Sequence, residues 1–209
     1  KGFDTMKSKV YFIRNITSDN VIKIYQKMGV NLTGRVAVKV HSGEDGNQNF
    51  LRPEFLEPMI DYVDGTVVEC NTAYDGARNT TEANTKLMEK HGWSRIFEVD
   101  ILDSEGDDLV LDIPDGKVIK KDYVGSHLKN YDSCLILSHF KGHPMGGYGG
   151  ALKQLSIGFA SSYGKAYIHG AWRPEDLWTA DHDKFLEAMA DAASAVCKYF
   201  KDNICYINI

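Results

Sequence analysis

Long hydrophobic runs are missing from this sequence. The longest apolar stretches, such as Cys134 to Leu137, hold only a few residues, whereas a helix that spans a bilayer needs about 20. The sequence therefore predicts no membrane segment and no membrane partner. The amino end also lacks an apolar signal core, and Met6 begins a stretch typical of a natural start. We therefore expect residues 1–5 to be foreign to the natural protein.

Cysteines are few and lie far apart. The four of them, at positions 70, 134, 197 and 205, form no C-x-x-C pair and no dense framework of the kind that staples small secreted domains. We therefore expect reduced thiols and a cytoplasmic protein. Cys70 and Cys134 fall in apolar runs, where cysteine usually behaves as a small hydrophobic residue.

Blocks of basic residues are absent as well. The chain has 24 Lys and Arg against 29 Asp and Glu, a formal net charge of −5, and no cluster that would neutralise a phosphate backbone. Nucleic acid is therefore not an expected partner. The hydrophobic share of 43% in 209 residues is enough to build one sizeable core.

Short β-branched runs alternate with helical patterns, as they do in βαβ units. We expect strands at residues 10–13, 35–40, 66–71, 95–100, 133–138, 166–169 and 204–209, and helices at residues 17–28, 53–63, 80–90, 151–161 and 183–200. A turn at Asp115-Gly116 predicts a β-hairpin between residues 109–111 and 117–119. The predicted fold is α/β: a mostly parallel Rossmann-like sheet flanked by helices, with a hairpin excursion around residues 108–120.

The predicted elements form a single α/β domain over residues 1–209, because no linker or repeat divides them. The chain ends inside the last predicted strand, so we expect the natural protein to continue past Ile209.

Ligands of open α/β sheets bind where parallel strands end at their carboxyl edge. Three polar loops follow predicted strands. They run from His41 to Arg52, from Asn71 to Thr81, and from His139 to Gly150.

The third loop carries two histidines, His139 and His143. Imidazole nitrogen is a common transition-metal ligand, suited to nickel, iron or zinc. Two histidines close together in a loop are also often only hydrogen-bonded, so both interpretations stay open.

Four glycines in the same loop, at positions 146, 147, 149 and 150, would let the backbone approach a ligand closely. Their amides could bind an anion where the next helix starts, or the glycines could simply form a tight turn. The pattern is neither a Walker loop nor a dinucleotide fingerprint. Lys153 follows in the first turns of the predicted helix, where a cation opposes the helix dipole, and this placement favours a functional role.

The string from His139 to Lys153, HFKGHPMGGYGGALK, together with DGARNTT from Asp75 to Thr81, resembles the family called domain of unknown function 362. The resemblance covers nearly the whole chain. It associates the chain with ferredoxin-like iron–sulfur segments, which members of that family often carry. The C-x2-C-x2-C-x3-C-P run of such segments is absent here, so an iron–sulfur cluster is implied by family association only.

A more distant resemblance is to the nickel-pincer lactate racemase family. His143, Lys153 and His169 are spaced like that family's catalytic histidine, cofactor-bearing lysine and nickel-binding histidine, and Arg52 resembles its substrate-carboxylate arginine. Ala77 stands where that family has its other catalytic histidine, and Gly149 where it has serine. The resemblance therefore implies a shared pocket with altered chemistry.

From these observations we expect an enzyme, metal-dependent and isomerase- or racemase-like, or an oxidoreductase, that binds a small anionic metabolite with a metal or metal-containing cofactor. The expected catalytic residues are His143, Lys153 and Arg78; the substrate-binding residues are Arg52, Asp75, Gly147, Gly149 and Gly150; the metal ligands are His169, His143 and His139. The alternatives are a non-catalytic ligand-binding or electron-transfer module that works with an iron–sulfur segment absent from this chain, and an oligomer with a structural role.

Overall fold

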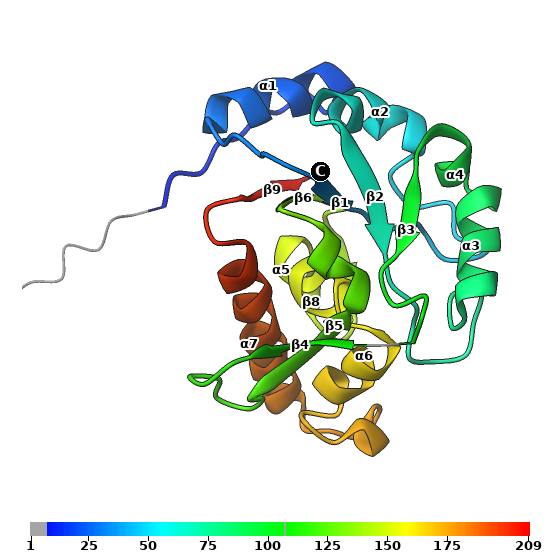
Figure 1. Ribbon diagram of the computed structural model, residues 1–209, viewed down its shortest axis with the longest axis vertical. Coiled ribbons are helices and arrows are strands. Elements are labelled where there is room, and N and C mark those ends of the chain that lie inside the picture. The colour runs from blue at the N-terminus through cyan, green and yellow to red at the C-terminus, as the bar shows by residue number, and fades with distance from the viewer. Residues whose placement is uncertain (1–7, 107) are drawn as a thin grey trace, which may run out of the picture.

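A parallel β-sheet of five strands forms the centre of the computed structural model, which describes residues 8–106 and 108–209 (Figure 1). The strand order is β3-β2-β1-β6-β9, and every neighbouring pair is parallel. The strands are β1 (Val36–Lys39), β2 (Gly65–Glu69), β3 (Val99–Ile101), β6 (Ser133–Ser138) and β9 (Ile204–Asn208). The expected parallel sheet of an α/β fold is confirmed.

Helices cover both faces of this sheet. Successive side chains along a strand point to opposite faces, so each strand packs on both helical layers. Val36 and Val38 pack on one layer, whereas Ala37, between them, packs on the other. The first layer consists of α1 (Ser18–Met28), α2 (Pro53–Tyr62), α3 (Thr81–Lys90) and α4 (Trp93–Ile96); the second contains α5 (Ala151–Lys153), the π-helical segment η2 (Gln154–Gly158) and α7 (His182–Phe200). No helix in the described part of the chain is long and apolar enough to cross a membrane. All four cysteines are free.

Side-chain caps fix the helix ends that the sequence predicts. The hydroxyl of Thr17 accepts the backbone N–H of Asn20 at the start of α1, and Gly29 ends that helix with a φ of 68°. The Thr80 hydroxyl caps α3 in the same way. The predicted bounds of α1, α2, α3 and α7 are therefore confirmed to within one or two residues.

A β-hairpin leaves the sheet between β3 and β6, as expected, but its second arm lies later than predicted. Strand β4 (Asp108–Asp112) pairs with β5 (Lys121–Gly125), and the 3-10 turn η1 (Ser126–Asn130) follows. Residues 117–119 do not pair with β4, because their backbone N–H groups donate to the carboxylate of Asp191 in α7.

The strand predicted at residues 166–169 is wrong. This segment lies in helix α6 (Ser162–His169), whose first turn is capped by the Ser161 hydroxyl. Gly164 lets α6 approach β5 closely, since a Cβ atom there would lie 1.9 Å from the carbonyl oxygen of Tyr123. The helix therefore packs on the hairpin and does not extend the sheet.

Two other strand predictions also fail, in whole or in part. Residues 10–13 form no strand and are largely exposed: Phe12 has 83% of its surface accessible. Residues 95–100 divide between the end of α4 and the start of β3. The helix expected at residues 151–161 forms, but it widens into the π-helical η2 after α5.

We predict that the buried carboxyl group of Asp122, in β5, makes the stability of the protein depend on pH. Burial raises its pKa to about 8, so between the unfolded pKa near 4 and this value the folded state holds one proton more than the unfolded state. The contribution of Asp122 to stability should then fall as pH rises, by up to about 1.4 kcal/mol per pH unit. Asp122→Asn should remove this slope in urea unfolding at pH 5, 6.5 and 8. Equal slopes for the variant and the natural chain would contradict the prediction.

Candidate functional site

A cavity of about 470 Å³ opens where the order of the central strands reverses. The chain runs from β1 outward to β2 and β3, and then returns to the other side of β1 as β6 and β9. His41 follows β1, His139 follows β6, and both line the cavity. Ligands of open α/β sheets bind at such a switch point.

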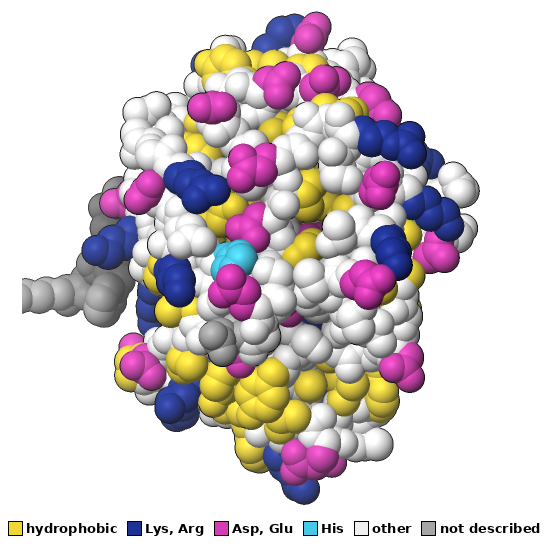
Figure 2. Space-filling view, turned by 45° about the vertical axis from the view of Figure 1, so that its right-hand side comes forward, with side chains coloured by type: hydrophobic (Ala, Val, Ile, Leu, Met, Phe, Trp, Pro, Cys, Tyr) yellow, Lys and Arg dark blue, Asp and Glu magenta, His cyan; other side chains and the backbone are white. Residues whose placement is uncertain are grey.

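Positive side chains outnumber carboxylates around this cavity. Its cationic residues are Lys39, Arg78, Lys141, Lys153 and Lys165, and its carboxylates are Glu44 and Glu69. On the molecular face shown in Figure 2, by contrast, Lys and Arg alternate with Asp and Glu. The cavity lining thus carries a surplus of positive charge, in a chain whose net charge is −5.

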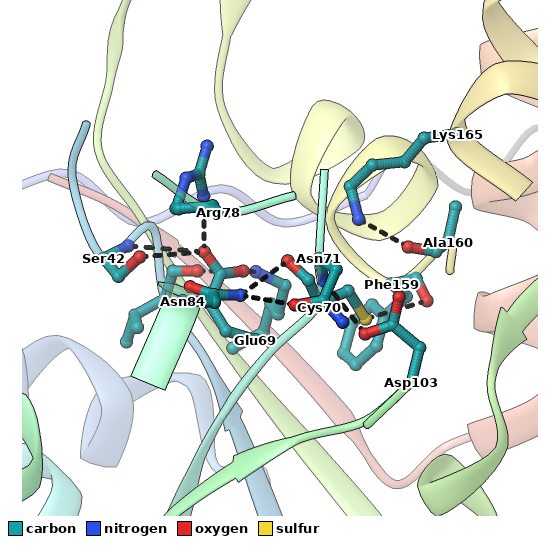
Figure 3. A network of polar contacts seen from close by, with 12 residues as sticks. Ser42, Glu69, Cys70, Asn71, Arg78, Asn84, Asp103, Phe159, Ala160 and Lys165 are labelled. Carbon is teal, nitrogen blue, oxygen red and sulfur yellow. Dashed lines mark hydrogen bonds and ion pairs between the residues drawn. The ribbon is translucent and has the colours of Figure 1, made fainter. Parts of the chain in front are cut away.

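Glu69 is the centre of a buried ion network at the end of β2 (Figure 3). Its Oε1 accepts from the Nζ of Lys39 on β1, and its Oε2 accepts from Arg78 Nη1 at 3.0 Å and from the Ser42 hydroxyl at 3.2 Å. Burial alone would raise the pKa of this carboxyl, but Lys39 and Arg78 outweigh burial and lower it to about 2. Glu69 is therefore ionised at any physiological pH.

Arg78 completes the network from the loop after β2. Its guanidinium also pairs with the carboxylate of Glu44, in the loop after β1. Burial would lower the pKa of Arg78, but Glu69 and Glu44 raise it. Both carboxylates of the cavity lining are thus paired with Arg78 or Lys39. These ion pairs join the loops that follow β1 and β2.

Lys165 lies on helix α6 and also lines the cavity. Its Nζ donates to the carbonyl oxygen of Ala160 at 2.5 Å, and burial lowers its pKa. Asp103, in the same part of Figure 3, accepts the backbone N–H groups of Asn71 and Ser162, both at 2.9 Å. These bonds anchor the start of α6 to the end of β3 and so fix the position of Lys165.

Lys153 lines the cavity from α5. Burial, together with the neighbouring cations of Lys141, Arg78, Lys165 and Lys39, lowers its pKa to about 8. A substantial fraction of its amine is therefore uncharged at mildly alkaline pH, when the nitrogen is nucleophilic.

The hydrogen bonds of His143 fix where its proton lies. Its Nδ1 accepts the backbone N–H groups of Met145, at 3.3 Å, and Gly146, at 3.0 Å. Burial, followed by the cations of Lys153 and Lys141, lowers its pKa to about 4, so the ring is neutral near pH 7. A neutral ring that accepts at Nδ1 carries its proton on Nε2. His143 is therefore set as a donor at Nε2.

His169 has the opposite arrangement. Its Nδ1 lies 2.8 Å from the carbonyl oxygen of Lys165, which can only accept, so Nδ1 carries the proton and Nε2 keeps its lone pair. Burial lowers its pKa to about 4, and the ring stacks on Phe185. A carbonyl that orients the distal N–H is the usual support for a metal-binding or proton-accepting imidazole.

Two further histidines line the cavity. The pKa of His41 lies well below its ordinary value because of burial and the neighbouring Arg78. The pKa of His139 is also lowered, by burial and by Lys141, and its buried Nδ1 has no hydrogen-bond partner among the described residues. All four cavity histidines are thus held in the neutral form.

The cavity brings together most of the residues that the sequence singles out. The converging residues are His143, Lys153, His169, Arg78, His139, Gly149 and Gly150. His169 comes from helix α6 and not from the strand expected there.

Three of the expected substrate-binding residues lie outside the cavity lining. Arg52 precedes α2, stacks over the Phe50 ring and donates to Gln48. Asp75 is exposed and accepts from Asn79. Gly147, with a φ of 70°, begins β8 (Gly147–Gly149), which pairs with β7 (Lys141–His143).

The glycine-rich segment is therefore a hairpin. The first residue of the helix that follows it, α5, has no free backbone N–H. The backbone N–H of Ala151 donates to the side chain of Asn208 in β9, at 2.9 Å. An anion in the cavity would instead meet side-chain cations.

Sequence reasoning missed Lys39, Glu69, Lys141 and Lys165. The pattern that could have revealed the first two is a charged residue inside an apolar parallel strand, as in VAVKV and TVVEC. Both faces of such a strand are buried, so a charge there must face a partner or a site.

No three His, Cys, Asp or Glu side chains within residues 8–106 and 108–209 gather closely enough to hold a metal ion by themselves. The donor that fits a metal is the lone pair of His169 Nε2. The site thus suits a metal whose other ligands come with it.

Comparisons with known proteins agree on the architecture. The sequence pattern of the family described as domain of unknown function (DUF362) matches residues 36–209. The lactate racemase apoprotein from Thermoanaerobacterium thermosaccharolyticum superposes with a TM-score of 0.57 at 14% identity, over 93% of this chain and 49% of that one. A protein from Thermotoga maritima superposes with a TM-score of 0.53 at 12% identity, over 91% of this chain and 50% of that one. No curated protein matches by sequence.

Both similarities show a shared fold. This chain spans about half the length of each of these two structures.

We predict that Glu69→Gln destabilises the protein by about 3–5 kcal/mol, because it leaves the buried cations of Lys39 and Arg78 without their shared carboxylate. Urea unfolding would measure this loss. The matched control is Glu98→Gln, which removes an exposed pair with Arg35 and should cost less than about 1 kcal/mol. Similar losses for the two variants would show that the network does not stabilise the fold.

Lys153 should react with a small acylating reagent such as acetic anhydride in a pH-dependent way, with a midpoint near its pKa of about 8. Competitive labelling followed by mass spectrometry would measure the rate, with exposed Lys86 of the same chain as the internal standard. A Lys153 rate that still rises between pH 9.5 and 10.5 would contradict this expectation.

Proposed function

The chain belongs to the DUF362 family, and from that premise we propose that it is an enzyme that binds a small anionic metabolite beside a metal or a metal-containing cofactor. The observation that carries this proposal is the cavity itself, where a surplus of cations surrounds the neutral rings of His143 and His169. Cations bind the anion, and neutral imidazoles supply both a donor and a lone pair. The fold shared with the lactate racemase apoprotein supports an isomerase-like or oxidoreductase reaction.

The lysines bind and orient the anion in this proposal. Lys141 comes from β7, Lys153 from α5 and Lys165 from α6, so they approach the cavity from three elements. Arg78 is held by two carboxylates and serves mainly to position the loop that it belongs to.

His143 and His169 take complementary parts. The Nε2–H of His143 donates a hydrogen bond to an oxygen of the bound anion. This hydrogen bond strengthens as negative charge develops on that oxygen. The lone pair of His169 Nε2 either accepts a proton or binds a metal. A transition metal bound there, nickel, iron or zinc, would supply Lewis-acid or redox chemistry.

Elemental analysis of the purified chain tests this proposal. We expect nickel, iron or zinc near one equivalent in the chain isolated from ordinary or from metal-supplemented cultures, because the other ligands have to arrive with the metal. His169→Ala should lower the retained metal at least tenfold, because one ligand is lost. His127→Asn is the matched control, since His127 lies on η1 and pairs with Asp100 outside the cavity. The proposal fails if neither preparation retains metal, or if His169→Ala retains as much as the control.

A further inference from the structure

Three cavity lysines have no carboxylate to neutralise them. Lys39 and Arg78 are paired with Glu69 and Glu44, whereas Lys141, Lys153 and Lys165 take part in no ion pair within the described residues. Asp103 and Glu69 act on Lys165 only from beyond ion-pair distance, and Asp103 lies outside the cavity lining. The lining itself therefore holds five cations against two carboxylates, and three of its cations have no carboxylate partner.

This arrangement costs the ligand-free protein stability. Buried Lys165 loses hydration and gains only the carbonyl oxygen of Ala160 in exchange, and the half-buried Lys141 and Lys153 add like charges around the same cavity. A ligand with one negative charge would balance one of the three. A ligand with two or three negative charges would balance two or all three of these lysines.

The positions of the three lysines also favour separated anionic groups. They come from β7, α5 and α6, and thus surround the cavity instead of forming one cluster. Lysine acts as a point charge on a flexible stem, so each one can bind an anionic group of its own. The volume of about 470 Å³ lies within the range of small-molecule sites.

Building on the proposed function, we propose that the ligand of this cavity carries at least two anionic groups, as a small dicarboxylate, a diphosphate or a phosphorylated carboxylic acid does, and that Lys141, Lys153 and Lys165 bind them.

Calorimetric titration at constant ionic strength tests the number of charges. Succinate is compared with acetate, and pyrophosphate with inorganic phosphate, so that the two comparisons separate carboxylate from phosphate chemistry. In at least one comparison the ligand with two anionic groups should bind at least tenfold more tightly and raise the melting temperature more. The inference would be overturned if acetate bound as tightly as succinate and phosphate also bound as tightly as pyrophosphate.

Variants identify the lysines responsible. Lys153→Met and Lys165→Met should each weaken binding of the preferred probe at least tenfold. They should also leave the melting temperature of the ligand-free protein unchanged or higher, because each removes a cavity cation that has no carboxylate partner. Lys153→Arg keeps the charge and should keep most of the binding. Lys129→Met, at an exposed position on η1, is the control and should change neither quantity.

The outcomes separate this inference from the proposed function. One outcome is that acetate binds as tightly as succinate and phosphate as tightly as pyrophosphate, with the binding of acetate and phosphate still dependent on Lys153. In that case the ligand carries a single anionic group, and only this inference fails. If no probe binds in a way that depends on any of the three lysines, anion binding in this cavity fails, and both proposals fail with it. Lower melting temperatures of the ligand-free Lys→Met variants would assign the lysines a structural role and overturn the inference.

Discussion

The bond between Lys39 and Glu69 is the interaction on which the cavity depends. It joins two charged side chains inside the sheet, at the carboxyl ends of the neighbouring strands β1 and β2, where both faces are otherwise apolar. Neither charge would be tolerated there alone. Glu69 also holds Arg78, and Arg78 holds Glu44, so this one pair fixes the loops after β1 and β2. The cavity opens between those loops and the loop after β6.

The fold could be predicted largely from sequence because its signals are local. Thr17, Thr80 and Gly29 mark helix ends by chemistry that acts within a few residues, and the apolar strands that follow them could only be the buried strands of a parallel sheet. Predictions failed where a distant partner decides the structure. Residues 166–169 look like a strand, yet they lie in helix α6, which packs against β5 through the close approach of Gly164 to Tyr123.

The site was predicted less completely, and for a different reason. His143, Lys153 and His169 could be named because their spacing resembles that of the lactate racemase family, and Arg78 because it follows a predicted strand, and the cavity does bring them together. Lys39 and Glu69 were missed because a lysine at the end of a strand is usually solvated, and only pairing shows that this one is buried. The opposite proton positions of His143 and His169 depend on backbone groups of Gly146 and Lys165, which no sequence pattern reveals.

Charge, more than directional hydrogen bonding, is what this cavity offers an anion. Arg52 is the arginine that the resemblance associates with a substrate carboxylate, but it stacks on Phe50 outside the lining. Arg78 lines the cavity, but its guanidinium is already paired with two carboxylates. The backbone N–H of Ala151, the first residue of α5, donates to the side chain of Asn208. The groups that remain are lysines. Because lysine recognises a charge without requiring a planar partner, selectivity in such a site has to come from the number and spacing of the anionic groups and from the two histidines.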